Sequence, residues 1–491
     1  MVARSSRARP TNQIQQARSA TRPARKKPLM EAAFFLLAFF MRCAWLLRAA
    51  IFPPSISACR DAVSRQLGNR RASLPARSRS LLSWFSESRR AGGCRASARG
   101  LQPVLSEVAM FEFCTHARTL VGAGASDALG ETLAARWGAS RVLLVTDGAL
   151  VSLGLAGRLR DALASAGHTV AMFDEVVADP PESVVERAII AARDARAQVI
   201  VGFGGGSSMD VAKLAAAFAG TTQDLRQAYG IGLVAGPRLP LVQVPTTAGT
   251  GSEATPIAVV TTGDGAKAGV ISPVLYADLA VLDATLTLGL PPAITAATGI
   301  DAMVHATEAY TSRVLKNPIS DALAREALRL LFRALPLACR DGGDLAARQD
   351  MLLGAMLAGQ AFANAPVGAV HALAYPLGSA FHVPHGLSNS LVLGPVLRFN
   401  SLRCETQYAE LADVILPGYA GGVAEKAAAF VQAMAEVAGA LELPTRLAQV
   451  GVTAADIPAL AGLALQQQRL LGNNPRDVTL ADATRLYEEA F

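Results

Sequence analysis

The amino-acid sequence predicts a parallel α/β segment followed by an all-helical segment. Between residues 141 and 219, short apolar runs rich in β-branched residues alternate with stretches of helical spacing. This order is typical of a parallel sheet with helices on both faces. A glycine-rich turn follows the third apolar run, and from Pro291 onward helical spacing continues almost to the end. Because ligands of such sheets bind at the carboxyl ends of the strands, we expect a ligand site at that edge of an α/β domain over residues 110–290, followed by an all-α domain over 291–491.

The individual elements follow from the hydrophobic periodicity. In the α/β segment we expect strands over 141–146, 168–173, 198–203, 239–244 and 278–283, and helices over 149–166, 182–195 and 210–219. Beyond a boundary near Leu290 we expect helices over 292–311, 318–335, 345–363, 423–440 and 455–464. With 51% hydrophobic residues, a chain of 491 residues is long enough to bury two such cores.

Charge is distributed unevenly along the chain. Residues 1–109 carry 20 Lys+Arg against 4 Asp+Glu, whereas the remaining residues carry 26 against 35. The overall charge of +7 therefore comes from an Arg/Ser/Pro-rich leader without a regular period. Since no basic surface is predicted on the folded part, a nucleic-acid partner is not expected.

The leader has three interpretations. A basic stretch before ten apolar residues (32–41) resembles a signal peptide, although Arg42 interrupts the run and about 20 residues are needed to cross a bilayer. The Arg- and Ser-rich, acid-poor composition also resembles an organellar transit peptide. The interpretation that we favour places the true start at Met110, so that residues 1–109 are a mis-assigned start and are disordered if translated. No membrane partner is expected for residues 110–491.

The six cysteines show no C-x-x-C or paired spacing. Neither a structural zinc site nor a disulfide framework is therefore expected, and a cytoplasmic location fits this composition. The sequence does not determine the oligomeric state, and a homo-oligomer is compatible with it.

Four side chains between residues 299 and 390 are candidates for one metal site. Asp301 and His305 are four residues apart in an apolar stretch, so a helix would present both on one face. His371 and His385 follow, and this stretch holds four of the six histidines. Imidazole nitrogen and carboxylate oxygen suit Fe²⁺ or Zn²⁺, and a catalytic site leaves one position open. For Asp301 and His305 taken alone, a hydrogen-bonded helical pair is the alternative.

The glycine-rich turn between residues 202 and 210 is a second candidate site. Its glycines would let backbone N–H groups approach a pyrophosphate, and the following helix N-terminus would add a favourable dipole. The turn lacks the G-x-G-x-x-G pattern, because Ser207 stands where the last glycine should be. A tight strand-to-helix connection therefore explains the turn equally well.

Together these motifs resemble those of the iron-containing (group III) alcohol dehydrogenases. The blocks G-x-D-x-x-x-H, V-H-x-x-x-x-P-L-G and P-H-G stand in family order over residues 299–386, and the similarity covers residues 111–491. The resemblance implies a dehydroquinate synthase-like architecture, with a Rossmann-like, dinucleotide-binding domain over residues 110–290 and an all-α metal-binding domain over 291–491. It also implies NAD as cofactor, and Fe²⁺, with Zn²⁺ as the alternative, bound by Asp301, His305, His371 and His385. The activity that it implies is hydride transfer between NAD(H) and a small alcohol, aldehyde or ketone.

The resemblance also implies a set of cofactor-binding residues. They belong to the G-G-G-S-x-x-D turn, the P-T-T-x-G-T-G-S-E motif and a later lysine block: Gly205, Gly206, Ser207, Asp210, Thr246, Thr247, Thr250, Ser252 and Lys267. Asp147 ends the first strand and would bind the adenosine ribose, which favours NAD over NADP; a helix N-cap explains it equally well. Asp179 matches a loop position near the adenosine, and Asp-Pro is also typical of a turn.

The acid–base group of the reaction is left open by the sequence. Relatives often carry a histidine where this chain has Tyr375, and a tyrosine titrates near pH 10, which suits an equivalent acid–base role poorly. His382 is a candidate substitute, and a structural histidine at the edge of the pocket is the alternative.

The substrate is predicted from the character of the metal stretch. No cluster of Arg or Lys lies there, while Ala361, Phe362, Val367 and Phe381 are apolar, so we expect a small uncharged alcohol or aldehyde. One alternative is a maleylacetate reductase of the same scaffold, which acts without metal and lacks the full ligand set. A second alternative, from another class, is a non-enzymatic membrane-associated protein that uses the basic leader as an anchor.

Overall fold

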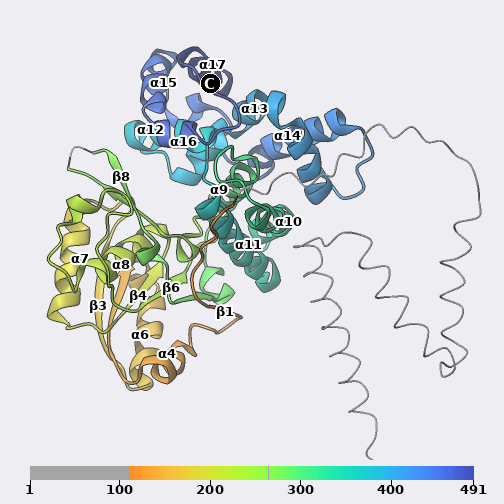
Figure 1. The fold of residues 1–491 in the computed structure, drawn as a ribbon. Coiled ribbons are helices and arrows are strands. Elements are labelled where there is room, and N and C mark those ends of the chain that lie inside the picture. Colours follow the sequence, from red (N-terminus) through yellow and green to blue (C-terminus); the bar gives the residue numbers. More distant parts are fainter. Residues whose placement is uncertain (1–109, 264) are drawn as a thin grey trace, which may run out of the picture. The chain divides into compact units, whose positions relative to one another are not determined.

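A computed structural model describes residues 110–263 and 265–491 (Figure 1). The interpretations of the leader concern residues outside this described part. Within the described part, strands alternate with helices up to Leu282, and only helices and short turns follow from Pro292 onward. A division into two domains at residue 290 remains a prediction.

The α/β segment is built on a six-stranded sheet in the order β1-β9-β6-β4-β2-β3, and all of its strand pairs are parallel. These strands are β1 (Thr119–Val121), β2 (Arg141–Asp147), β3 (Thr169–Val176), β4 (Val199–Gly204), β6 (Leu241–Pro245) and β9 (Leu279–Leu282). The central strands β4 and β6 are buried along their whole length, as expected for a parallel sheet covered on both faces. The fold prediction is confirmed, and β1 is a strand that the periodicity did not predict.

Helices cover both faces of this sheet (Figure 1). They are α4 (Leu129–Trp137), α5 (Gly148–Ser152), α6 (Leu155–Ser165), α7 (Glu182–Asp194) and α8 (Gly206–Phe218). Along β2, Leu143 and Val145 pack with α7 and α8, whereas Val142 and Leu144 pack with α4 and α6. Since successive side chains of a strand point to opposite faces, one apolar run contributes to two separate cores.

Two helix predictions in this segment are corrected by the structure. The helix expected over 149–166 is two helices, α5 and α6. Gly154, between them, has φ = 77°, which is not a helical conformation, and so interrupts the helix. Helix α8 begins at Gly206 rather than at residue 210, so the last glycine of the turn and Ser207 belong to its first turn. Gly205 is its N-cap.

A small three-stranded sheet, in the order β5-β8-β7, was not predicted. It consists of β5 (Gly230–Ile231), β7 (Ile257–Thr261) and β8 (Lys267–Ile271). Strands β7 and β8 form an antiparallel pair in which Thr261 is opposite Lys267. This pair carries Lys267 toward the pocket described below.

The helical segment contains α9 (Pro292–Thr311), α10 (Pro318–Arg340), α11 (Leu345–Asn364), α12 (Ala369–Phe381), α13 (His385–Ile415), α14 (Val423–Ala440), α15 (Ile457–Leu465), α16 (Gln468–Leu471) and α17 (Leu480–Ala490). Helix α13 is bent where Cys404 departs from helical geometry. One continuous apolar core joins these helices. Within the described residues, no single helix is long and apolar enough to span a membrane; α11 and α12 pass that test only as a pair bent by 107°.

Candidate metal and cofactor site

The four predicted metal ligands lie together, although three different helices carry them. Asp301 and His305 are one turn apart on α9, His371 lies near the start of α12, and His385 is the first residue of α13. One donor atom from each lies within 4.8 Å of all the others. The Nε2 atoms of His305, His371 and His385 are 3.9, 3.9 and 3.5 Å from Asp301 Oδ1.

This donor set fits a divalent transition metal. Ligand atoms about 2.1 Å from one tetrahedral metal lie about 3.4 Å apart, so small side-chain adjustments would complete the geometry. Three imidazole nitrogens with one carboxylate oxygen suit Fe²⁺ or Zn²⁺ better than Mg²⁺ or Ca²⁺, which prefer oxygen ligands. The cluster lines the wall of a cavity, so a metal held here would be open to a small ligand.

The protonation of the cluster suits metal binding. Burial lowers the pKa of His305 to about 3, so its ring is neutral at physiological pH. Burial acts to raise the pKa of Asp301, but the three imidazoles and the amide of Asn389 outweigh it and hold that pKa below its usual value. At neutral pH the cluster therefore offers a carboxylate and an unprotonated imidazole without first releasing a proton.

Two supporting residues escaped the sequence prediction. Glu308 Oε2 lies 2.6 Å from His371 Nδ1, and its Oε1 accepts the Val370 N–H at 2.7 Å. A carboxylate at Nδ1 leaves the Nε2 lone pair of the imidazole directed at the metal position. Asn389 Nδ2 donates to Asp301 Oδ1 at 2.6 Å. The sequence feature that could have predicted Glu308 is its position three residues after His305, which places both on the same face of α9.

The glycine-rich turn forms a close-packed cradle at the carboxyl end of β4. A Cβ on Gly206 would lie 2.9 Å from Thr250 Cγ2, and one on Gly205 would lie 3.6 Å from Thr247 Oγ1. Gly204 has φ = 147°, a region that favours glycine, and its carbonyl accepts the Thr246 N–H at 2.9 Å. The N-terminus of α8 therefore faces the threonines of the P-T-T-x-G-T-G-S-E motif, an arrangement suited to a phosphate.

A buried lysine holds the two cofactor motifs together. Lys213, which is fully buried, donates to Ser252 Oγ at 2.6 Å, to the Ile257 carbonyl at 2.6 Å and to Asp210 Oδ1 at 3.2 Å. Ser252 Oγ in turn donates to Asp210 Oδ1 at 2.6 Å. Asp210 and Ser252 were predicted as cofactor residues, whereas Lys213 was missed. It lies one turn after Asp210 on α8.

The residues expected near the adenosine have protein partners of their own. Asp147 Oδ1 accepts from the backbone N–H groups of Ala149 and Leu150, both at 3.0 Å, and so caps α5. Its Oδ2 lies 3.5 Å from Ser208 Oγ. Asp179 pairs with Lys267 at 2.6 Å. The structure thus supports the N-cap interpretation of Asp147, while its second oxygen stays near the Gly204 turn.

A cavity of about 570 Å³ joins the metal cluster to the cofactor motifs. The α/β segment contributes residues such as Gly206, Ser207 and Thr250, and the helical segment contributes the four metal ligands, Phe362, Val367, Val383 and Tyr375. The His305 ring is stacked on Phe362, with centroids 4.3 Å apart. The two sets of motifs, separate in the sequence, therefore face one space.

The two candidates for the acid–base group lie in different places. Tyr375 lines the cavity, with its ring centroid 5.8 Å from that of His385, and burial raises its pKa. His382 is exposed at the C-terminal end of α12 with φ = 55° and is not among the residues lining the cavity. The structure therefore does not bring His382 to the site.

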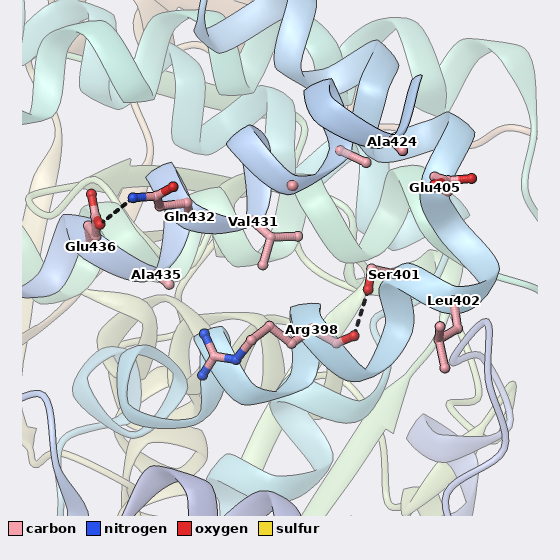
Figure 2. A pocket seen from close by; sticks show the side chains of 11 residues that line it. Arg398, Ser401, Leu402, Glu405, Ala424, Val431, Gln432, Ala435 and Glu436 are labelled. Atoms are coloured by element: carbon pink, nitrogen blue, oxygen red, sulfur yellow. Dashed lines mark hydrogen bonds between the residues drawn. The ribbon is translucent and has the colours of Figure 1, made fainter. Parts of the chain in front are cut away.

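A second hollow, of about 610 Å³, lies between α13 and α14 (Figure 2). Alanines and Val431 form much of its wall, and Arg398, Glu405, Gln432 and Glu436 lie around it. Gln432 Nε2 donates to Glu436 Oε1 at 2.9 Å. Among the residues that the structure describes, no histidine or cysteine lines this hollow, and we assign no chemistry to it.

Comparison with known proteins agrees with this geometry. Residues 116–284 match the family model described as iron-containing alcohol dehydrogenase, and residues 295–491 match that of the Fe-containing alcohol dehydrogenase family, C-terminal. Long-chain-alcohol dehydrogenase 1 of Geobacillus thermodenitrificans is 40% identical over 376 residues, which cover 76% of this chain and 94% of that protein. Sulfoacetaldehyde reductase of Bilophila wadsworthia is 36% identical over 356 residues, covering 72% of this chain and 92% of that protein.

Solved structures give the same result. The structure of a 1,3-propanediol oxidoreductase has a TM-score of 0.74 and 34% identity, and the match covers 78% of this chain and all of that one. Sulfoacetaldehyde reductase from Bifidobacterium kashiwanohense in complex with NAD⁺ has a TM-score of 0.71 and 29% identity, over 78% of this chain and 98% of that one. The chain belongs to the iron-containing alcohol dehydrogenase family and is an oxidoreductase of the alcohol dehydrogenase class.

Proposed function

We propose that the chain transfers hydride between NAD(H) and a small alcohol or aldehyde at a metal held by Asp301, His305, His371 and His385. One observation carries this proposal: the four donor atoms and the phosphate cradle of α8 line the same cavity of about 570 Å³. A metal beside the nicotinamide end of a dinucleotide is what alcohol oxidation needs. Fe²⁺ is proposed as the metal, with Zn²⁺ as the alternative.

The chemistry at the reacting carbon follows from the two bound groups. When bound, a divalent metal would supply Lewis acidity toward the substrate oxygen. The chain's own residues position and desolvate that oxygen. Phe362, Val367 and Val383 form an apolar wall beside the metal ligands, and a dry site strengthens the electrostatic interactions inside it.

The cofactor motifs would hold the dinucleotide in a fixed register. Backbone N–H groups at Gly206 and Ser207 would bind the pyrophosphate at the N-terminus of α8. The buried Lys213 donates to Ser252 at 2.6 Å and to Asp210 at 3.2 Å, and Ser252 itself donates to Asp210 at 2.6 Å. The motif after β6 would therefore be rigid before the cofactor arrives. The NAD⁺ complex of the sulfoacetaldehyde reductase supports NAD as cofactor.

The names of several relatives support a small substrate, whereas the relative that is 40% identical is named a long-chain-alcohol dehydrogenase. The former include 1,3-propanediol dehydrogenase of Klebsiella pneumoniae and lactaldehyde reductase of Escherichia coli, which are 35% and 34% identical. The complete donor set does not favour the metal-free maleylacetate reductase alternative. Location in the cytoplasm and the absence of nucleic-acid and membrane partners remain predictions.

The test is NADH oxidation by the full chain after metal removal and separate reconstitution with Fe²⁺ and Zn²⁺, with short aldehydes as substrates. We expect one of the metals to restore turnover. Replacing His371 with Ala removes an imidazole ligand and should reduce turnover by about a hundredfold or more. His382→Asn is the matched control, because His382 lies outside the cavity and Asn tolerates positive φ. A fully active His371→Ala variant would refute the proposed ligand set.

A further inference from the structure

A guanidinium group lies at the cavity from a part of the chain that the substrate prediction did not consider. Helix α16 begins more than 80 residues after His385 and brings Arg469 and Leu470 to the cavity, next to Gln467. The expectation of an uncharged substrate rested on the lack of basic residues near the metal ligands in sequence. In three dimensions the cavity has a basic residue on its helical side.

Arg469 is a cation of this cavity whose side chain has no protein partner among the described residues. Of the lysine and arginine residues that line the cavity, Lys267 pairs with Asp179 at 2.6 Å and donates to Thr261 Oγ1 at 3.0 Å. Within the part of the chain that the structure describes, Arg469 makes neither a side-chain hydrogen bond nor an ion pair. Its charge nevertheless acts on the Tyr375 phenol inside the cavity and lowers the pKa of that group, against the larger effect of burial.

The backbone that carries Arg469 is anchored close to the metal ligands. Asn473, which follows α16, donates to the Val367 carbonyl at 3.0 Å and to the Arg469 carbonyl at 2.9 Å. The buried Asn474 accepts the Ala369 N–H at 3.3 Å, two residues before His371. These buried amides fix α16 relative to the start of α12, so the backbone from which the exposed Arg469 side chain extends is held beside the metal ligands.

The other charged groups of the cavity do not neutralise this cation. Asp210 is bonded to Lys213 and Ser252, and Asp301 belongs to the metal cluster. Leu470 is apolar and contacts the same space, as does Phe362. A substrate with its oxygen at the metal cluster would therefore extend along apolar side chains and end at an unpaired guanidinium.

We propose that Arg469 is a specificity-determining residue that favours short aldehydes carrying a carboxylate or a sulfonate. The proposal rests on the proposed function, because the aldehyde oxygen must lie at the metal cluster for its anionic end to reach α16. Guanidinium binds carboxylate and sulfonate oxygens through paired N–H donors. The uncharged analogue of such a substrate would leave Arg469 unpaired and gain nothing from it.

The experiment compares matched aldehydes with the reconstituted full chain and NADH. Succinic semialdehyde is compared with its methyl ester, and sulfoacetaldehyde with propanal. We expect kcat/KM to be about tenfold higher for the anionic member of at least one pair, as a partly exposed charge-assisted bond would give. The pair that shows the larger ratio identifies carboxylate or sulfonate as the preferred group.

Arg469→Gln should lower the anionic-to-neutral ratio to about one, and Arg469→Lys should retain part of it. Arg403→Gln is the matched control, since Arg403 is exposed on α13 and does not line the cavity; it should keep the wild-type ratio. The KM for NADH is measured in every variant. A wild-type ratio near one, a ratio unchanged in Arg469→Gln, or a loss confined to NADH affinity would overturn the proposal. Wild-type inactivity toward every aldehyde would instead overturn the proposed function itself.

Discussion

At the scale of single residues, the site depends on side chains that hold other side chains. Glu308 orients His371 through a 2.6 Å contact, Asn389 orients Asp301 through a 2.6 Å bond, and Lys213 fixes Ser252. None of the three was predicted, because sequence spacing shows which polar residues share a helix face but not which of them meet a residue from another helix. The ligands themselves were predictable, since a carboxylate and imidazoles are seldom buried in apolar stretches unless they are paired or bind a metal.

Replacing Glu308 with Gln should weaken metal binding by about ten- to a hundredfold. The amide can still contact His371, but it no longer supplies the negative charge that raises the basicity of the ligand. Chelator competition measures the metal affinity. Glu326→Gln, which only breaks a surface pair with Arg329, is the control, and equal affinities of the two variants would contradict the assigned role of Glu308.

Asp147 is predicted to set the preference for NAD over NADP. Because Asp147 also caps α5, Asp147→Asn is the variant that removes its charge without removing the cap. Asn at this position can still accept the N-cap hydrogen bonds but carries no charge. If the carboxylate lies near the adenosine ribose, NADP would bring a like charge close to it, which costs about 1.5–3 kcal/mol after screening. We expect a roughly ten- to hundredfold preference for NADH over NADPH in the wild type, as that energy implies, and a much smaller one in Asp147→Asn. A wild type that uses both cofactors equally would reduce Asp147 to a helix cap.

Glu253 should make stability depend on pH. Burial raises the pKa of this carboxyl from 4.5 to about 7, and the charge of Lys213 only partly opposes that effect. The folded state therefore binds a proton that the unfolded state releases between these values. The stability that this proton adds to the folded state is complete below pH 4.5 and is lost as the pH rises through 7, by about 3 kcal/mol in total. From pH 6 to 9, the thermal midpoint of the wild type should fall relative to that of Glu253→Gln by about 2–3 °C. If the thermal midpoints of the wild type and of Glu253→Gln changed in parallel with pH, the raised pKa of Glu253 would be contradicted.

At the scale of elements, the cavity depends on a close contact between the cofactor loop and α11. Gly251 has φ = 59°, and a Cβ on Gly359 would lie 2.7 Å from the Gly251 carbonyl oxygen and 2.9 Å from its Cα. Because both neighbours are backbone atoms, neither can move without shifting the loop that carries Thr250 and Ser252. The two glycines therefore set how closely the cofactor and metal motifs approach each other.

Gly359→Ala should destabilise the protein by about 1–3 kcal/mol and raise the KM for NADH, because the added methyl group displaces the cofactor loop. Gly157→Ala is the matched control. Gly157 lies in α6 with nothing within 4 Å of the added Cβ, so that change should stabilise by up to about 1 kcal/mol. Thermal unfolding and NADH kinetics measure both. If the two variants behave alike, the contact at Gly251 does not control the cavity.

The elements also show where periodicity is informative. Helices α9 and α14 begin and end where the pattern placed them. Helix α10 continues beyond its expected end at residue 335 to Arg340, with Pro336 inside it. The small sheet β5-β8-β7 has strands of two to five residues, too short for an alternating pattern to stand out. The break at Gly154 was visible as a glycine, but a single glycine in a helical pattern does not identify an interruption by itself.

At the scale of the whole molecule, separate sequence motifs become one site because the fold brings two segments to one cavity. The parallel sheet places the α8 turn at its carboxyl edge, as the predicted fold class requires. The position of Arg469 at the cavity could not be predicted from the sequence, because Arg469 lies more than 80 residues after the last metal ligand, His385, in the chain. The family resemblance supplied the ligands and the cofactor motifs, whereas the charge of the substrate end of the cavity emerged only from the three-dimensional structure.

The central claim is that one metal held by Asp301, His305, His371 and His385 is required for hydride transfer. Titrating the metal-depleted chain with Fe²⁺ without oxygen, while following aldehyde-dependent NADH oxidation, tests it most directly. The activity should rise in proportion to added metal and level off at about one metal per chain, as four ligands for one ion require, and His371→Ala should stay inactive over the same range. Full activity before any metal is added, or equal activity in that variant, would contradict the claim.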